Sequence, residues 1–204
     1  MSKLNFIIPP EGFEYCRNRI AEILADEIGN QFVYTGDAEL SSVLISMEGD
    51  IPYDKIEVIK TVIGVSLGQT VYGAAHAGNH SADYTFFLDV HTGAKTTSSQ
   101  AGDAKAAIRA QRFAGLIRSI LENPQYRTLG YAPGFISRVS MEKFDIAAQV
   151  PGDSRYSSMI RLYFHVELPE ICKLIDPNLI EGYQTVVTLG TTSLGYIYIG
   201  ESYP

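Results

Sequence analysis

The chain has 204 residues, of which 46% are hydrophobic and 19% are charged, and its formal net charge at neutral pH is −7. This composition fits a folded globular protein and excludes collagen-like, low-complexity and intrinsically disordered chains. The acidic balance argues against tight nucleic-acid binding. No apolar run reaches the roughly 18 residues that span a bilayer, and residues 1–10 lack the features of a secretion signal, so we expect folding in a cytoplasm.

The first part of the chain combines a helix with short strands. Apolar residues at helical spacing predict a helix over residues 11–28, and Gly29-Asn30 is a typical helix end. Short apolar runs then predict strands over residues 31–34 and 42–47. The two cysteines, Cys16 and Cys172, are far apart and have no neighbouring ligand residues, so we expect unpaired thiols.

The centre of the chain predicts a long hairpin. Apolar residues alternate with polar ones over residues 57–67 and 84–91, which predicts two longer amphipathic strands. The connection between them, residues 68–83, is rich in Gly, Ala, Asn and Ser. Connections of this length are usually functional or mobile. We therefore expect hairpin arms that extend beyond the body of the domain, with a connection that is mobile in the isolated subunit and ordered by a neighbour.

The next segment predicts the main helix and an antiparallel strand pair. The helix begins at Asp103 and ends at Leu121 or Glu122, and its apolar stripe includes Ile108 and Leu116. Strands are predicted over residues 135–146 and 158–168, with a turn at Pro151-Gly152-Asp153. The second strand is the clearest element of the chain, because five apolar residues recur at every second position: Ile160, Leu162, Phe164, Val166 and Leu168.

The last residues contain two strand-like segments, 183–189 and 194–199, which predict a C-terminal hairpin. We therefore predict an α+β fold. An antiparallel sheet with a long central hairpin packs against the main helix and the N-terminal helix, and the C-terminal hairpin is an appendage. Residues 1–168 form the core in this interpretation, and residues 169–204 form the extension.

The chain has four histidines, which are candidates for metal ligands or interface residues. His76 and His80 have the i, i+4 spacing of a helical ligand pair, and His91 lies further along. The flanking glycines make a helix improbable there, which favours polar or interfacial side chains over a metal site. His165 lies on the polar face of its strand, where a solvated or interfacial role is expected.

A serine and three aspartates complete the chemical candidates. Ser66 lies in Gly64-Val65-Ser66-Leu67-Gly68, which has the spacing of a nucleophile elbow but not its strand–turn–helix context. Asp83, Asp89 and Asp103 have the side chains that hold divalent cations. Their contexts favour a turn residue, a strand-face residue and a first-turn helix acid instead. We therefore predict no catalytic, cofactor or metal site.

The basic residues concentrate on the main helix and just after it, at Arg109, Arg112, Arg118 and Arg127. Nucleic-acid contact is one interpretation, and salt bridges to acids of a neighbouring subunit fit the acidic chain better. Thirteen Tyr and no Trp also favour protein–protein contact surfaces. The predicted interface residues are Tyr72, His76, His80, Asp83, Arg109, Arg112 and Arg118.

The order of elements over residues 11–168 resembles the tail terminator and tail-completion family of tailed bacteriophages. The stretches that carry the resemblance are residues 84–91, the helix ending at residues 113–121, Thr128-Leu129-Gly130, and the strands at residues 135–146 and 157–167. The resemblance lies in the topology, and no fixed motif carries it. The C-terminal appendage departs from the minimal family pattern, which leaves another neck, connector or tail-tube component as an alternative.

The resemblance implies a virion protein, assembled in the host cytoplasm, that forms a ring at the head-proximal end of the tail. Such rings are commonly hexameric, halt tail-tube polymerisation and dock to the head connector. The implied partners are further copies of the chain, the tail tube protein and neck proteins. Duplex DNA would pass an acidic lumen without specific binding, and no membrane is involved. Two further alternatives are a small metal-dependent hydrolase using His76, His80 and His91, and a monomeric ligand-binding module.

Overall fold

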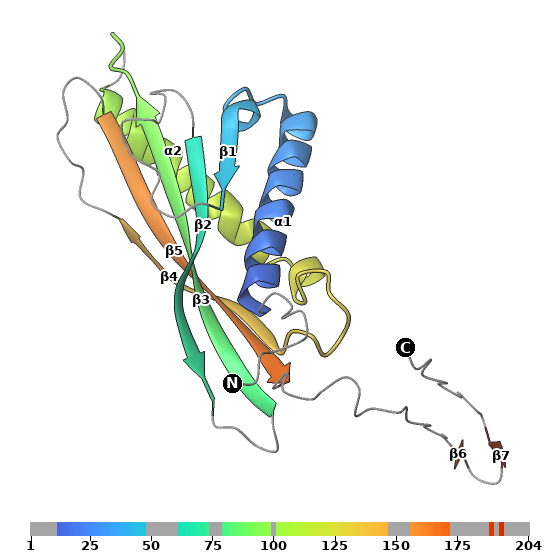
Figure 1. Cartoon of the computed structure of the whole chain (residues 1–204). Helices are drawn as coiled ribbons and strands as arrows, with labels where there is room; N and C mark the ends of the chain where they lie inside the picture. The colour runs from blue at the N-terminus through green and yellow to red at the C-terminus, as the bar shows by residue number, and fades with distance from the viewer. Residues whose placement is uncertain are drawn as a thin grey trace, which may run out of the picture. The chain divides into compact units, whose positions relative to one another are not determined.

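A computed structural model describes residues 12–47, 61–73, 79–98, 101–146, 156–171, 188–189 and 192–193. The chain divides into two compact units, Met1–Glu170 and Ile171–Pro204. The first unit, shown in Figure 1, combines two long helices with a five-stranded sheet. Its elements are α1 (Gly12–Thr35), η1 (Leu40–Ser42), β1 (Val43–Ser46), β2 (Thr61–Tyr72), β3 (Asn79–Ala94), α2 (Gly102–Leu121), η3 (Pro124–Tyr126), β4 (Arg138–Ile146) and β5 (Tyr156–Ile171).

The strand order in the sheet is β1-β2-β3-β5-β4. β2 pairs antiparallel with β3, and β4 pairs antiparallel with β5. β3 and β5 also run in opposite directions, because side-chain contacts join Thr85 to His165 near one end and Asp89 to Arg161 further along. The predicted α+β class is therefore confirmed. The sheet is mixed rather than wholly antiparallel, because the edge strand β1 pairs parallel with β2. The connection over residues 47–60 supplies the dozen or more residues that a parallel pairing needs.

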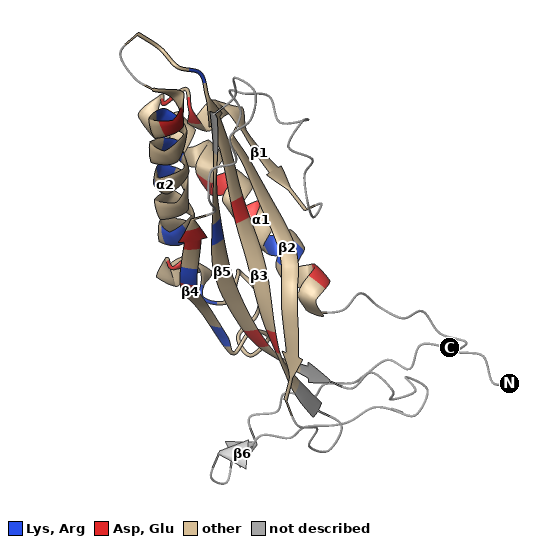
Figure 2. Ribbon diagram, turned by 90° about the vertical axis from the view of Figure 1, so that its left-hand side faces the viewer, with Lys and Arg blue, Asp and Glu red and all other residues tan. Residues whose placement is uncertain are grey.

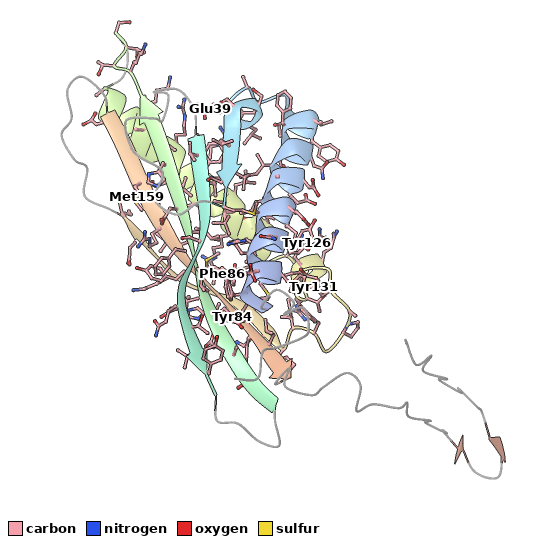
Figure 3. The ribbon with its side chains drawn as sticks, viewed as in Figure 1. Glu39, Tyr84, Phe86, Tyr126, Tyr131 and Met159 are labelled. Atoms are coloured by element: carbon pink, nitrogen blue, oxygen red, sulfur yellow. The ribbon has the colours of Figure 1, made fainter. Side chains whose placement is uncertain are left out.

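One face of the sheet packs against both helices, and we call it the inner face. The alternating residues predicted to be buried, from Ile160 to Leu168, lie in this core. From the helices, Cys16, Ile20 and Leu24 of α1 and Phe113 and Ile117 of α2 join them. Tyr84 and Phe86, labelled in Figure 3, lie on the same face.

One residue of the predicted α2 stripe, Ile108, does not belong to its buried side and is 59% exposed, whereas Leu116 is partly buried and packs against the core. Small residues form much of the buried side, because Ala106, Ala110 and Ala114 are among the buried residues of this helix. Small side chains let the helix approach the sheet closely, and a hydrophobicity pattern gives them little weight.

The predicted strand over residues 31–34 is wrong, because α1 continues through it to Thr35. Gly29 does not stop the helix, which a single glycine weakens by only about 1 kcal/mol. The end comes at Gly36, whose φ of +65° suits glycine and whose N–H donates to Phe32 O at 2.8 Å. The last turn carries three exposed apolar residues: Phe32, Val33 and Tyr34.

The long connection predicted over residues 68–83 is also corrected. β2 continues to Tyr72 and β3 begins at Asn79, so both sides of this segment are strand, and residues 74–78 lie outside the described residues. Gly73 N donates to Ser81 O at 2.7 Å, which extends the pairing past the end of β2. Main-chain pairing between the arms overrides the loop-like composition. The extended hairpin arms themselves are as predicted.

In the second unit the structure describes one short antiparallel pair, β6 (Thr188–Leu189) with β7 (Thr192–Ser193). Thr188 pairs with Ser193 and Leu189 with Thr192, so the second strand lies in the predicted connection between residues 189 and 194. The rest of the predicted C-terminal hairpin lies outside the described residues.

Candidate functional site

The sheet face opposite the helices, here called the outer face, carries an ordered array of polar and aromatic side chains. Because side chains alternate along a strand, the residues between the core positions of β3, β5 and β4 all lie on this face. They contact one another across the strands. The array comprises Asp83, Thr85, Phe87, Asp89, Lys143, Asp145, Arg161, Tyr163 and His165.

Phe87 of β3 is at the centre of the array. Its ring centroid lies 5.2 Å from that of Tyr163, with an interplanar angle of 71°, and Arg161 Cζ lies 4.4 Å from the Phe87 centroid. Arg161 Nε and Nη2 donate to the two carboxylate oxygens of Asp89 at 2.7 and 2.8 Å. The Asp89 side chain is only 13% exposed. A two-point pair of this kind, held against an aromatic ring, fixes the guanidinium in one orientation.

The array continues to the edge strand β4 through Tyr163. Lys143 Nζ lies 4.4 Å from the Tyr163 centroid and 3.5 Å from the carboxylate of Asp145. The hydrogen bond to Asp145 raises the pKa of Tyr163 above its usual value. Cations, aromatic rings and carboxylates therefore alternate across the neighbouring strands β3, β5 and β4. The side chains of the outer face are thus ordered by contacts within one chain.

A glycine bulge in β2 makes room for Phe87. The register of β2 against β3 shifts between Leu67 and Gln69, which leaves Gly68 as the extra residue. A Cβ atom on Gly68 would lie 2.4 Å from two carbons of the Phe87 ring. A larger residue at this position would therefore force the Phe87 ring to move. Ser66 lies within β2 opposite Phe87, and the chain continues as strand, which is not the geometry of a nucleophile elbow.

His165 joins three strands at the end of the outer face from which the hairpin arms extend. Its Nε2 lies 2.7 Å from Glu142 Oε2 of β4. Its Nδ1 lies 3.2 Å from Thr85 Oγ1 and 3.4 Å from Asp83 Oδ1, both of β3. Beside it is an open depression of about 330 Å³, lined by Asp83, Arg138, Ser140, Met141, Glu142, His165 and Glu167. Contacts on both ring nitrogens make His165 a bridge between β3 and β4.

The hairpin residues of the predicted interface lie at this end of the sheet. Tyr72 ends β2 and is 55% exposed, and Asp83 lies on the rim of the depression. His80 belongs to β3, but its side chain is not described, and His76 lies outside the described residues. Tyr72 and Asp83 are therefore the two that the structure brings to one region.

The three arginines of the predicted interface lie on α2, along which basic residues follow one another in Figure 2. Arg109 is buried, donates to Glu39 Oε1 at 2.8 Å and donates to Gly93 O at 2.8 Å. Arg112 pairs with Asp37 and Glu39, and Arg118 pairs with Glu122. These ion pairs are within one chain. Each guanidinium nitrogen of Arg109 donates a hydrogen bond within the chain, so Arg109 holds α2 to the loop before β1, where Figure 3 labels Glu39.

The pKa of one member of this helix-side group is displaced. The backbone N–H of Glu39 donates to Asp37 Oδ1 at 3.0 Å, and Arg112 pairs with the same carboxylate. These contacts, the backbone hydrogen bond first, hold the pKa of Asp37 below its usual value of 3.8. Asp103 has a local role as well, because its carboxylate accepts from Ala104 N in the first turn of α2.

Residues 124–136 are held against α1 in a similar way. Arg19 Nε donates to Leu129 O at 2.9 Å, and Tyr131 Oη donates to Tyr15 O at 3.0 Å. Tyr126 donates to Glu27, and this bond raises the pKa of Tyr126. Figure 3 labels Tyr126 and Tyr131 beside α1. This segment closes one end of the core.

Among the described residues, no three His, Cys, Asp or Glu side chains gather in a way that would hold a metal ion. Neither of the two long helices is apolar enough over its length to cross a membrane. No protein-family model matches the chain, and a search of curated proteins finds no match.

Phe87, Lys143, Arg161 and Tyr163 were not among the candidates chosen from the sequence. Their alternation between core residues was visible there, but the pairing of β3 with β5 was not.

Proposed function

We propose that this chain is a structural protein of a tailed bacteriophage, a tail terminator or a related neck or tail component, and that it works by assembling with copies of itself into a ring. The observation that carries the proposal is the organisation of the sheet. Its inner face is covered mainly by the subunit's own helices, whereas its outer face presents an ordered, partly exposed array of charged and aromatic side chains with the hairpin arms at one end. Rigid surfaces of this kind suit association, since little side-chain freedom is lost on binding.

The charge of the outer face fits this role better than direct nucleic-acid binding. Its basic residues lie beside carboxylates, with Arg161 on Asp89 and Lys143 beside Asp145. A surface for phosphates requires cations that are free to release counterions. The chain as a whole has a net charge of −7, which suits a ring through which duplex DNA slides without adhering.

The element order supports the same proposal. In chain order, α1 and a short strand precede the β2–β3 hairpin, and α2 and the β4–β5 pair follow it. This is the order on which the resemblance to tail terminators rests. We further propose that the chain is not an enzyme. Ser66 lies in mid-strand, and Asp89, which would be the acid of a triad, is engaged by Arg161.

Assembly is the decisive test. The purified chain is examined by mass photometry and negative-stain imaging between about 0.1 and 50 μM, alone and mixed with tail tubes and head connectors. We expect discrete rings that attach to tube ends. The triple variant Ser66→Ala, His76→Ala, His80→Ala is expected to assemble as the wild type does. A chain that stays monomeric and joins neither structure overturns the proposal, and a stoichiometric metal lost with His76→Ala would favour a metalloprotein.

A further inference from the structure

The sheet has two open edges, and they differ in character. β3 pairs with β2 along one edge, whereas on the other edge β1 pairs with only the first four residues of β2. No other strand in the described part of the chain pairs with residues 65–71 on that second edge, and this open part of β2 reads Val-Ser-Leu-Gly-Gln-Thr-Val and contains no charged residue. At the opposite edge β4 has nine residues, four of them charged, and a bulge at Glu142. Charges and bulges are the usual protection of an exposed edge, and the β2 edge has only its glycine bulge.

The strand directions make the two edges complementary. From β2 to β4 the sheet contains four strands, β2, β3, β5 and β4, and each runs opposite to its neighbour. With an even number of alternating strands, β4 runs opposite to β2. A second copy related by a simple rotation therefore brings its β4 antiparallel to the open part of β2. Seven residues of β2 then meet a strand of nine, which is about 23 Å of possible main-chain pairing.

Apolar side chains at the β4 edge indicate what such a joint would cover. Phe144 and Ile146 pair with the core residues Leu162 and Ile160, so they point to the inner face. They are nevertheless 53% and 59% exposed. Behind the β2 edge, α1 packs on that same inner face. Pairing of β4 with the β2 edge of a second copy brings these two side chains toward that copy's α1.

We infer that residues 65–71 of β2 bind strand β4 of a second copy, antiparallel and head to tail, so that the sheets of neighbouring subunits join. The inference rests on the proposed ring and names its contact. A joint between two unlike edges is the heterologous type of contact that closes rings. Backbone groups on both strands provide the bonding, and Phe144 and Ile146 add apolar contact.

A matched pair of variants tests the β4 side. Ile146→Asp places a charge in the proposed joint, and Ile108→Asp places one on the exposed side of α2. Both isoleucines are 59% exposed in the subunit, so both variants are expected to fold with wild-type circular dichroism and melting. We expect Ile146→Asp to weaken assembly at least tenfold in sedimentation velocity, and Ile108→Asp to leave it unchanged.

Cysteine cross-linking tests the joint directly, in a Cys172→Ser background. Gln69 and Val71 of β2 and Arg138 and Ser140 of β4 all lie on the outer face, since they pair with Thr85, Asp83, Glu167 and His165. The four combinations of one β2 cysteine with one β4 cysteine are oxidised with diamide. At least one should give a ladder of covalent multimers up to the ring size, because each copy carries both halves of the joint. Each single-cysteine variant should stay monomeric on denaturing gels.

The outcomes separate the two proposals. Rings that form but give no ladder, or that tolerate Ile146→Asp, overturn the joint and leave the ring. Covalent dimers formed by variants with a single introduced cysteine in β2 would mean that the β2 edges of two copies pair with each other. That result also overturns the joint. A wild-type chain that never assembles removes the ring and the joint together.

Discussion

The two faces of the sheet are built from the same strands, and residues adjacent in sequence serve opposite purposes. On β5, Leu162 is buried against the helices, while Tyr163 contacts Phe87 and Lys143 on the outer face. The inner face is apolar and is covered by the subunit's own helices except at the β4 edge, where Phe144 and Ile146 are exposed. The outer face holds its order through cation–ring contacts and ion pairs that are partly exposed. The comparison teaches that ordered side chains on this sheet do not all serve stability, because the outer-face array, apart from the buried Thr85 and Asp89, remains partly or fully exposed to water.

The largest expected effect comes from placing the same charged residue on the inner face and, in a second variant, on the outer face. Leu162→Asp buries an unpaired charge, which costs several kcal/mol out of a total stability of about 5–15 kcal/mol, so we expect insoluble or unfolded protein. Tyr163→Asp, one residue further, should fold, with a free energy of unfolding lowered by no more than about 1.5 kcal/mol. Soluble expression and urea denaturation measure both. Equal behaviour of the two variants would contradict the assignment of the faces.

The contact between Gly68 and Phe87 should show how far the outer face depends on close packing. Gly68→Ala forces the added methyl group into the Phe87 ring, and overpacking of this kind costs about 1–3 kcal/mol. The double variant Gly68→Ala, Phe87→Ala removes the clash. We expect its loss to be smaller than the sum of the two single losses, as measured in a double-mutant cycle by urea denaturation. Strict additivity would mean that the two residues are not in contact.

The arginines of α2 provide a second contrast, between a buried cation and a half-exposed one. Arg109→Met leaves Glu39 without one of its partners and Gly93 O without its donor, so we expect a loss of about 2–3 kcal/mol. The Arg112 side chain is 50% exposed, and Arg112→Met should cost less than about 1 kcal/mol. Thermal denaturation of both variants at low and high salt measures the difference. A larger loss for Arg112→Met would reverse their assigned roles.

The smallest expected effect is a pH dependence. The pKa of Asp37 is lowered in the folded chain, chiefly by the Glu39 N–H and then by Arg112. The stability from this shift is complete above the unfolded pKa near 3.8 and is lost as the pH falls through the lower folded pKa. Asp37→Asn should therefore reduce stability at pH 7 and make the acid side of the stability profile less steep. Parallel profiles for the two proteins from pH 7 to pH 2.5 would contradict this.

Period-two patterns in the sequence predicted the sheet, and they did so because burial on one face leaves a local trace. The alternation from Ile160 to Leu168 located β5 and its buried side correctly. The end of α1 was missed because the deciding residue, Gly36, has a backbone conformation that residue type alone does not fix. The outer-face array was missed for a different reason. Phe87 and Arg161 are 74 positions apart, and only the pairing of β3 with β5 brings them together. Long-range register is a property of the folded sheet and has no local signature.

The bulge at Gly68 also changes which positions of β2, odd or even, face the helices. Leu67 and Thr70 are three positions apart, yet both lie on the inner face, because the bulge uses one residue without advancing the pairing. Odd positions face the helices before it, and even positions do so after it. Deleting Gly68 would remove the bulge and leave Leu67 and Thr70 two positions apart with the same partners, so each arm side chain would keep its face. A deletion elsewhere in β2 would instead turn every arm side chain beyond it to the other face, so we expect it to be far less tolerated than deletion of Gly68.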